Sequence, residues 1–450
     1  VEYQRSLRDI IRNCIYGVDV NPMAVELCKV SLWMESLEPG RPLGFLDHRI
    51  RYGNSLVGMF NTNVLNEGIP PDAYKALSGD DRETATRLRN DNRSERGDVD
   101  KGQLRIRWDE AEELRRLAEA ALDFEEWDDD SVEEIAEKEA AYSEWRDHAR
   151  RRRDEAACDL WVAAFHIPKT PANLRHVPTT QAVAEHLMVG ETAITQGMRD
   201  AVANASAGAV FFHWPLEFPR VFHRGGFDLV LSNPPWERVK LQEQEFFAVH
   251  DAGIAAAATK AIRGGLIKGL ADSNPALLQA FEEAKHDAEA SSQFLRTSGR
   301  YAKTGVGDVN TYAVFAGLGR SLTSPRGRAG IIVPTGIATD NTYREFFAEV
   351  TETGALASLY DFENREKLFE AVDSRYKFSL LTLCGEKQEE VQFAFFLTQP
   401  SQLSDKRRRF TLTSDDFARI NPNTRTCPIF RTRRDAEITR KIYENVPVLV

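Results

Sequence analysis

The chain has 450 residues, of which 42% are hydrophobic, and it carries a formal net charge of -11. This length allows two or three domains with sizeable cores, and the hydrophobic content is ordinary for a globular protein. The five cysteines form no C-x-x-C pair, which excludes the common zinc and disulfide frameworks and favours a reducing compartment. Because no apolar run is long enough to span a bilayer and no signal peptide is present, we expect a cytoplasmic protein without a membrane partner.

The charge is distributed unevenly. Residues 75–155 hold 26 acidic and 17 basic side chains, whereas residues 401–450 hold 11 basic and 6 acidic ones. A locally basic surface attracts phosphate groups whatever the sign of the whole chain. We therefore expect the C-terminal end to face nucleic acid.

The first predicted elements are a short strand over residues 14–20 and a buried helix over residues 23–37, which Asn21 caps and Pro22 starts. A second short strand, residues 49–52, runs into Gly53-Asn54-Ser55. Asp19 ends the first strand, where a carboxylate suits the ribose hydroxyls of a nucleotide. The alternatives are a plain helix cap for Asp19 and an ordinary turn for residues 53–55.

Residues 61–210 are predicted to be a helical insertion. From about residue 70 to 155 the sequence is rich in charged helix formers with apolar residues at helical spacing, which predicts a solvent-exposed helical hairpin. Residues 156–210 also look helical, with interruptions at three prolines. Since strand patterns resume only at residue 227, this stretch separates two parts of one sheet.

Four later segments read as strands: residues 227–231, 329–333, 378–383 and 391–396. Helices are predicted between them, over residues 311–322 and 343–352, and residues 385–388 are predicted to join the last two strands as a hairpin. Alternating strands and helices indicate an α/β fold with a doubly wound sheet, here ending in an antiparallel hairpin. The basic, irregular sequence after residue 400 suggests another domain.

Asn233-Pro234-Pro235-Trp236 stands one residue after the strand at 227–231. Two prolines fix φ and donate no hydrogen bond, so the strand cannot continue and the loop is held at its carboxyl end. The Asn233 amide oxygen and the Pro234 carbonyl could accept the two N–H bonds of an aromatic amino group, with Trp236 stacked on the ring. The alternative is a structural Pro-Pro turn.

Residues 16–22, 53–56, 227–236 and 327–334, in this order, resemble the S-adenosylmethionine-dependent, adenine-specific DNA methyltransferases of restriction-modification and phage-defence systems, in particular the large single-chain type. The resemblance implies a Rossmann-like methyltransferase domain formed by residues 1–60 (cofactor half) and 211–400 (catalytic half). It also implies that residues 401–450 begin a DNA-recognition domain. The implied partners are double-stranded DNA with a flipped adenine and other subunits of a defence system.

The resemblance also assigns roles. It places Asp19 and Val20 at the ribose of S-adenosylmethionine, Asn54 and Ser55 at its adenine, and Asn233, Pro234, Pro235 and Trp236 at the target amino group. Phe369 matches an aromatic residue that stacks on the flipped base, with a core phenylalanine as the alternative. Residues 307–312 resemble a loop and helix start before the next strand, or simply a capped helix. No metal is implied.

The sequence departs from this family pattern in two places. Position 54 is Asn, where an acidic residue is common, and no glycine-rich cofactor loop precedes Asp19. We expect that loop to lie upstream of Val1. Two alternatives remain: methylation of RNA bases or of protein glutamine by a similar loop, and a catalytically incomplete DNA-recognition or scaffold subunit.

Overall fold

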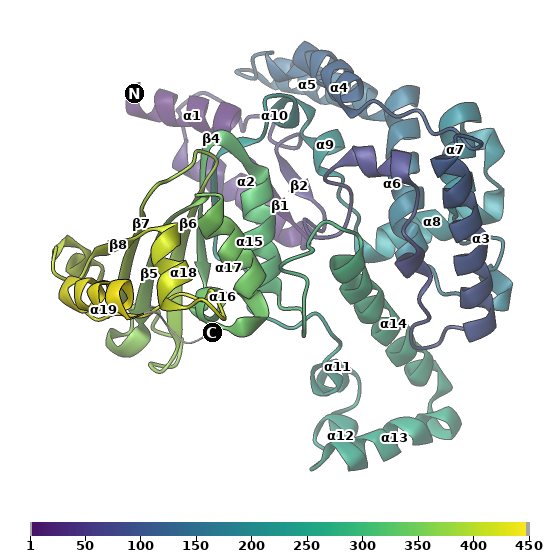
Figure 1. Cartoon of the computed structure of the whole chain (residues 1–450). Coiled ribbons are helices and arrows are strands. Elements are labelled where there is room, and N and C mark those ends of the chain that lie inside the picture. Colours follow the sequence, from purple (N-terminus) through teal and green to yellow (C-terminus); the bar gives the residue numbers. More distant parts are fainter. Residues whose placement is uncertain (1, 447–450) are drawn as a thin grey trace. The chain divides into compact units, whose positions relative to one another are not determined.

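The computed structural model describes residues 2–446, which fall into two compact units (Figure 1). Within the described residues, unit 1 comprises residues up to 223 together with 240–298, and unit 2 comprises residues 224–239 together with those from 299 onward. No helix in the described part of the chain is long and apolar enough to cross a membrane.

Unit 1 is mainly helical. Its helices and strands are α1 (Glu2–Cys14), β1 (Gly17–Asp19), α2 (Pro22–Glu35), β2 (Ile50–Tyr52), α3 (Arg82–Asp100), α4 (Glu110–Glu125), α5 (Val132–Asp147), α6 (Ala149–His166), α7 (Thr180–Val189), α8 (Gln196–Ala209), α9 (Trp214–Glu217), α10 (Pro219–His223), α11 (Glu243–His250), α12 (Ala252–Ala255), α13 (Lys260–Ser273) and α14 (Pro275–Thr297).

Unit 2 is an α/β structure. Its elements are β3 (Phe227–Ser232), α15 (Thr311–Leu322), β4 (Thr323–Val333), α16 (Gly336–Thr339), α17 (Arg344–Glu352), β5 (Leu356–Glu363), β6 (Lys377–Cys384), β7 (Val391–Leu397), β8 (Phe410–Leu412), α18 (Ser414–Ile420) and α19 (Arg433–Asn445).

Strands β1 and β2 form a parallel pair in unit 1, with Asp19 opposite Tyr52. Between them runs α2, whose N-cap Asn21 accepts a hydrogen bond from the Met23 amide and whose first residue is Pro22, as predicted from the sequence. A small core of apolar side chains from α1, α2 and the approach to β2 holds the pair: Ile11, Val25, Leu46 and Ile50.

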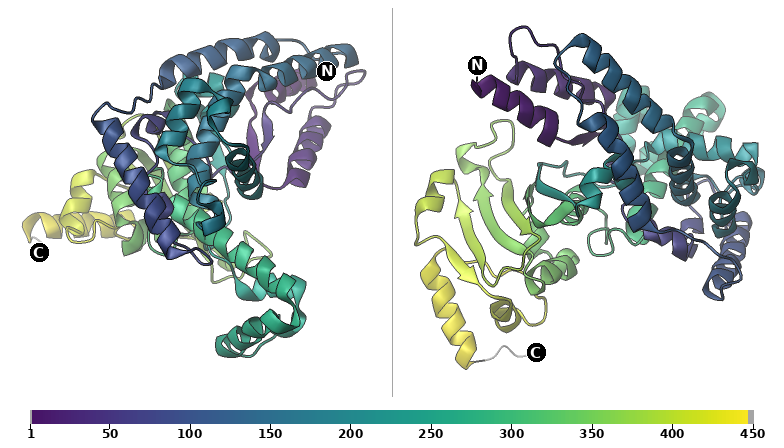
Figure 2. Two further views of the ribbon diagram at one scale, coloured as in Figure 1. Left: turned by 90° about the vertical axis from the view of Figure 1, so that its right-hand side faces the viewer. Right: turned by 90° about the horizontal axis from the view of Figure 1, so that it is seen from above.

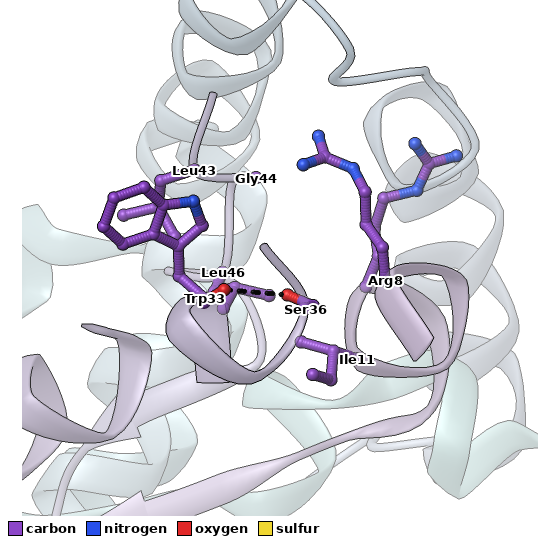
Figure 3. A pocket seen from close by; sticks show the side chains of 8 residues that line it. Arg8, Ile11, Trp33, Ser36, Leu43, Gly44 and Leu46 are labelled. Carbon is purple, nitrogen blue, oxygen red and sulfur yellow. Dashed lines mark hydrogen bonds between the residues drawn. The ribbon is translucent and has the colours of Figure 1, made fainter. Parts of the chain in front are cut away.

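A small cavity lies between α1, α2 and the segment that follows α2 (Figure 3). It is lined by Arg8, Ile11, Trp33 and Leu46, among others, and its volume is about 10 Å³. That is room for about one water molecule. The cavity is therefore too small to hold a nucleotide, and a nucleotide site in unit 1 has to lie elsewhere.

The helical insertion is present, but residues 75–155 are not a solvent-exposed hairpin. They form three helices, α3 to α5, and part of a fourth, α6, and the α4–α5 pair buries Phe124 and Trp145 together with Phe45 from the N-terminal region. The Asp129 carboxylate is fully buried and accepts hydrogen bonds from the Arg12 side chain and the Phe45 amide. Some acidic residues of this segment are thus buried rather than solvated. A buried charge needs partners, and Asp129 has them.

The remaining helices of unit 1 are α11 to α14. Figures 1 and 2 show α11, α12 and α13 gathered at one end of the long helix α14. A separate apolar cluster, centred on Phe247, Ile267 and Phe281, holds that end together. At the other end of α14, Phe294 contacts the ring of Phe165 in α6, 5.3 Å between centroids.

Unit 2 contains a six-stranded mixed sheet in the order β3-β4-β6-β5-β7-β8. Strands β3 and β4 are parallel, and so are β5 and β7, whereas β6 runs antiparallel between β4 and β5. The predicted hairpin of residues 378–396 is therefore wrong. Strand β5 lies between β6 and β7, and its own pattern was not recognised in the sequence.

One face of this sheet carries the main core of unit 2. Helices α15, α17, α18 and α19 contribute Ala316, Phe347, Phe417 and Ala436 to it, packed against sheet residues such as Ile331 and Phe393. Residues 401–446 therefore belong to the same compact unit as the sheet, and β8 extends it. The boundaries expected from the sequence for the cofactor half, the insertion, the catalytic half and the DNA-recognition domain stay predictions.

Strand β3 is an edge strand of the sheet, paired only with β4 among the described residues. On the face opposite α15, its Leu229 and Leu231 side chains are 60% and 73% exposed. The neighbouring strand places Gly330 beside Leu231. The carboxyl end of β3 is where the Asn-Pro-Pro-Trp sequence begins.

Candidate functional site

Asp19 and Asn54 lie at the carboxyl ends of two neighbouring parallel strands in unit 1. Asp19 is the last residue of β1, and Asn54 follows β2 by two residues. The Gly53 amide donates to the Asp19 carbonyl, 2.9 Å, which ties the two strand ends together. The structure thus brings these sequence-predicted residues to one edge of the parallel pair, where ligands bind in open α/β sheets.

The Asp19 side chain is exposed and has a local partner for one oxygen only. Its Oδ1 accepts a hydrogen bond from the Asn21 amide at 2.7 Å, and its other oxygen has no partner within residues 2–446. Val20, the next residue, is 55% exposed. Asp19 therefore both shapes the start of α2 and leaves a carboxylate oxygen for another donor, so the cap and the nucleotide site are compatible.

Asn54 is fixed by the backbone around it. Its Oδ1 accepts from the Leu56 amide at 3.1 Å, and its own amide donates to the Val210 carbonyl at 2.8 Å. The Asn54 Nδ2 group has no partner among the described residues and remains a free donor. Ser55 contributes its carbonyl, which accepts from the Trp214 indole at 2.9 Å.

Gly53 explains why this turn follows β2 directly. A Cβ at this position would stand 2.3 Å from a ring atom of Phe212, so only glycine lets the turn approach that ring. Phe212 is buried, and its neighbour Phe211 forms an isolated parallel bridge with Asn54 and so supports the candidate site.

Asn233 follows β3 in unit 2, as the sequence predicts. Its side chain is exposed and makes no hydrogen bond to any residue within 2–446, and Pro234 behind it is buried. The Pro234 carbonyl likewise accepts no hydrogen bond from the described residues. An amide oxygen and a carbonyl oxygen on a proline-stiffened turn are thus both available to an external N–H donor.

The loop is held from a distant part of the chain. The Thr311 hydroxyl donates to the Pro235 carbonyl at 2.6 Å, the Glu237 amide donates to that hydroxyl at 3.0 Å, and the Thr311 amide donates to the Glu237 carbonyl at 2.9 Å. Residues 307–312 were expected to be a loop and helix start or a capped helix. They are a capped helix start that also bonds to the Asn233 loop.

Trp236 packs partly into the core of unit 2. It is half-buried against the apolar cluster of Phe362, Phe378, Ala394 and Leu397. Its indole nitrogen is buried without a hydrogen-bond partner in the described chain. The ring is thereby fixed rather than free to swing. A base could stack only on the part of the ring that this cluster leaves uncovered.

Phe369 lies on the loop between β5 and β6 and is 36% exposed. Its ring contacts Phe378 edge-on, with centroids 5.0 Å apart, so it borders the same cluster as Trp236. The fully buried Asn364 shapes this loop by donating to the carbonyls of Phe369 and Val372. Phe369 is therefore partly exposed and partly packed. Its ring contacts the same cluster that Trp236 contacts.

Asp361 near the end of β5 is a buried polar residue that sequence reasoning missed. Its side chain accepts hydrogen bonds from the Thr335 hydroxyl and from the Phe396 amide. Burial, only partly offset by these hydrogen bonds, raises its pKa. Phe396 has φ +59°, so Asp361 stabilises a left-handed residue within β7. No local pattern marks Asp361, because it lies within an otherwise apolar strand.

A larger cavity, of about 690 Å³, lies among α4, α5 and α6 in unit 1, and none of the candidate residues lines it. Its arginines are already paired: Arg116 contacts Asp154 at 2.6 Å and Arg151 contacts Glu217 at 2.9 Å. Burial and the charge of Glu113, opposed by Arg116, raise the pKa of Asp154 to about 7. These charges form an internal network that supports the insertion.

More than half of the chain matches a known protein family. The model of the Eco57I restriction-modification methylase family matches residues 13–261, which is more than half of the chain and contains Asp19, Asn54 and Asn233. A protein of Methanocaldococcus jannaschii, named for a type II restriction enzyme and methyltransferase, is 39% identical over 64 residues. That match covers 12% of this chain and 5% of the other protein.

Three solved structures show weak similarity. They are the type I restriction-modification methyltransferase subunit of Streptococcus thermophilus (11% identity, 70% of this chain and 79% of that one, TM-score 0.25), the type IIG restriction endonuclease BpuSI (13%, 64% and 36%, 0.22) and a candidate class I S-adenosylmethionine-dependent methyltransferase of Listeria monocytogenes (10%, 66% and 96%, 0.22). At such TM-scores these similarities establish neither the fold nor the function.

Proposed function

The chain belongs to the Eco57I restriction-modification methylase family, and we propose that it moves a methyl group from S-adenosylmethionine to the exocyclic amino group of adenine in DNA. The observation that carries this proposal is the Asn233 loop. It leaves an amide oxygen and a carbonyl oxygen unpaired at the carboxyl end of a sheet strand. We place the reaction in a restriction-modification or phage-defence system in the cytoplasm.

The residues of unit 1 fit the nucleoside part of the cofactor. The unpaired oxygen of Asp19 can accept a hydrogen bond from a ribose hydroxyl, and the free Nδ2 group of Asn54 can donate to an adenine ring nitrogen. Val20 and Ser55 flank these two side chains. When bound, the cofactor supplies an electrophilic methyl group on a sulfonium, so no metal is needed for the transfer.

The residues of unit 2 fit the acceptor. An adenine amino group is a poor nucleophile because its lone pair is conjugated into the ring. The Asn233 amide oxygen and the Pro234 carbonyl would accept its two N–H bonds and favour a tetrahedral nitrogen whose lone pair points at the methyl group. Trp236 and Phe369, on one aromatic cluster, would hold the faces of a base that has left the duplex, at a cost of a few kcal/mol.

The cofactor half (1–60), the insertion (61–210), the catalytic half (211–400) and a DNA-recognition domain starting at 401 keep the boundaries expected from the sequence.

Two other functions follow from the same features. The loop would also suit methylation of RNA bases or of protein glutamine, because both present an amino or amide nitrogen. A catalytically incomplete DNA-recognition or scaffold subunit would instead explain why no glycine-rich loop precedes Asp19. The fixed, unpaired Asn233 favours an enzyme, since a scaffold has no use for two free acceptors on a stiffened turn.

The test is methyl transfer with three acceptors. The protein is incubated with methyl-labelled S-adenosylmethionine and with double-stranded DNA, RNA or a glutamine-containing protein. We expect label only in DNA, recovered as N6-methyladenine after digestion to nucleosides. Label in RNA or protein alone would establish the alternative enzyme, and DNA binding without transfer would establish the scaffold.

A further inference from the structure

We propose that Thr311 is the positioning residue of the Asn233 loop and that its hydroxyl fixes where the two acceptor oxygens stand. The inference rests on the proposed function of the loop and adds a residue 76 positions beyond Pro235. It concerns unit 2 alone, in which both the loop and Thr311 lie.

The loop needs an outside anchor because of its own sequence. Neither Pro234 nor Pro235 has a backbone N–H, so two consecutive residues cannot donate to a neighbouring strand or close a turn. The loop is also mostly exposed, with Asn233, Pro235 and Glu237 on the surface, so packing alone holds only Pro234 and Trp236. A donor from another segment is therefore required for the carbonyl between Pro235 and Trp236.

Thr311 supplies that donor and uses every group it has. Its hydroxyl donates to the Pro235 carbonyl at 2.6 Å, with the Glu237 carbonyl at 3.2 Å as a second acceptor for the same proton. The same oxygen accepts from the Glu237 amide at 3.0 Å, and the Thr311 amide donates to the Glu237 carbonyl at 2.9 Å. One residue thus bonds the loop at two positions on the C-terminal side of Asn233, Pro235 and Glu237.

The anchor itself is rigid. Thr311 is the first residue of α15, whose N-cap Asn310 accepts from the Tyr312 amide. The following residues, Ala313 and Val314, are completely buried. Through Thr311, the position of the exposed loop is therefore tied to the packed core of unit 2.

The other contacts between these two segments cannot replace the hydroxyl. Arg238 and Asp308 form an ion pair at 3.3 Å, but their side chains are 58% and 62% exposed, and such pairs contribute little. The Val239 amide donates to the Val309 carbonyl at 2.9 Å, six residues after Asn233. Neither contact reaches Pro235, which is two residues from the acting amide.

The test compares three variants of the enzyme. T311V removes the hydroxyl but keeps the shape, T311S keeps the hydroxyl, and T323V is the matched control. The Thr323 hydroxyl, at the other end of α15, donates to the Gly319 carbonyl at 2.7 Å and touches no part of the loop. Hydrogen exchange of the Glu237 amide is measured by mass spectrometry, together with kcat, the KM for S-adenosylmethionine and the melting temperature.

For T311V we expect Glu237 exchange to rise roughly five- to tenfold, as one net hydrogen bond is lost. We expect kcat to fall about ten- to hundredfold through misplacement of Asn233, with an unchanged KM for the cofactor. T311S and T323V should stay within about threefold of wild type in kcat. This pattern separates positioning from stability, because T323V also loses a partly buried side-chain hydrogen bond at α15.

Two results would overturn the inference. One is unchanged exchange at Glu237 in T311V, which would show that the loop does not depend on the hydroxyl. The other is a loss of kcat in T323V that matches T311V at the same loss of melting temperature, which would show that only stability matters. If wild type transfers no methyl group to DNA, the proposed function fails, and the exchange measurement still decides whether Thr311 holds the loop.

Discussion

The proposed cofactor turn of unit 1 and the proposed acceptor loop of unit 2 hold their polar groups in different ways. Both stand at the carboxyl end of a parallel strand. The side chains of Asp19 and Asn54 each accept a hydrogen bond from a backbone amide two residues further on, so each side chain is held within its own turn, while the Asn54 backbone is also bonded to Val210. The Asn233 loop has two prolines instead and is fixed by Thr311, from another segment of the chain.

The difference follows from what each site must leave unpaired. A nucleotide site can use one oxygen of Asp19 for its own turn and the other for the ligand. An amino group with two N–H bonds needs both the Asn233 amide oxygen and the Pro234 carbonyl. If the loop were held by hydrogen bonds to these two oxygens, they would no longer be available to the amino group. The two prolines and the hydroxyl of Thr311 hold the loop without using either oxygen.

The largest effect that would sharpen this comparison is expected at Asp19. D19N keeps an oxygen for the Asn21 amide but removes the charge that a ribose hydroxyl would meet. Hydrogen bonds to charged groups contribute about 1.5–3 kcal/mol, so the Kd for S-adenosylmethionine should rise about tenfold or more. Isothermal titration calorimetry measures it, with D9N on the exposed side of α1 as the control. An unchanged Kd would remove Asp19 from the cofactor site.

A second effect concerns the aromatic residues beside the acceptor loop. W236A and F369A should each weaken binding to DNA carrying its target adenine by ~1–3 kcal/mol, and by less when the target is mismatched and already unpaired. The fluorescence of 2-aminopurine at the target position reports extrusion of the base. If F369A lowers the melting temperature and leaves the fluorescence rise intact, Phe369 serves the core and not the base.

A third, smaller effect separates the insertion from both loops. Because the pKa of Asp154 is raised to about 7 from 3.8, its contribution favours folding fully below about 3.8 and is lost as the pH rises through about 7. The free energy of unfolding of wild type, relative to D154N, should fall by about 2–3 kcal/mol between pH 5 and pH 8. Urea titrations at each pH measure this. Equal pH dependence in both proteins would show that Asp154 is ionised throughout, and a change in cofactor affinity would show that the insertion takes part in the site.

The sequence predicted the elements whose signals are local. The Asn21-Pro22 start of α2, the end of β3 before Pro234 and the Asn310 cap of α15 each depend on a few adjacent residues, and each is present. The hairpin of residues 378–396 failed because β5 occupies the position between its two strands, and pairing order is a property of the whole sheet.

The candidate site was predicted from the same kind of local signal. Asp19, Asn54 and Asn233 were identified because a strand end and a polar residue adjoin each other in sequence. Thr311 was not, since nothing near it shows that a proline loop 76 residues away lacks a donor. Asp361 was missed as well, because a single acid inside an apolar strand carries no pattern that distinguishes a buried anchor.

The central claim is that Asn233 acts on the acceptor nitrogen while Asp19 acts on the cofactor, and single-turnover methyl transfer at saturating S-adenosylmethionine tests it most directly. N233A should be slower by ~3 kcal/mol, about a hundredfold, because one preorganised contact of the transition state is lost. D19N should transfer within about threefold of wild type, since excess cofactor compensates for weaker binding. N423A, which replaces an exposed asparagine of unit 2, serves as the control. A rate for N233A within about threefold of wild type, or one that recovers as more cofactor is added, would contradict the account.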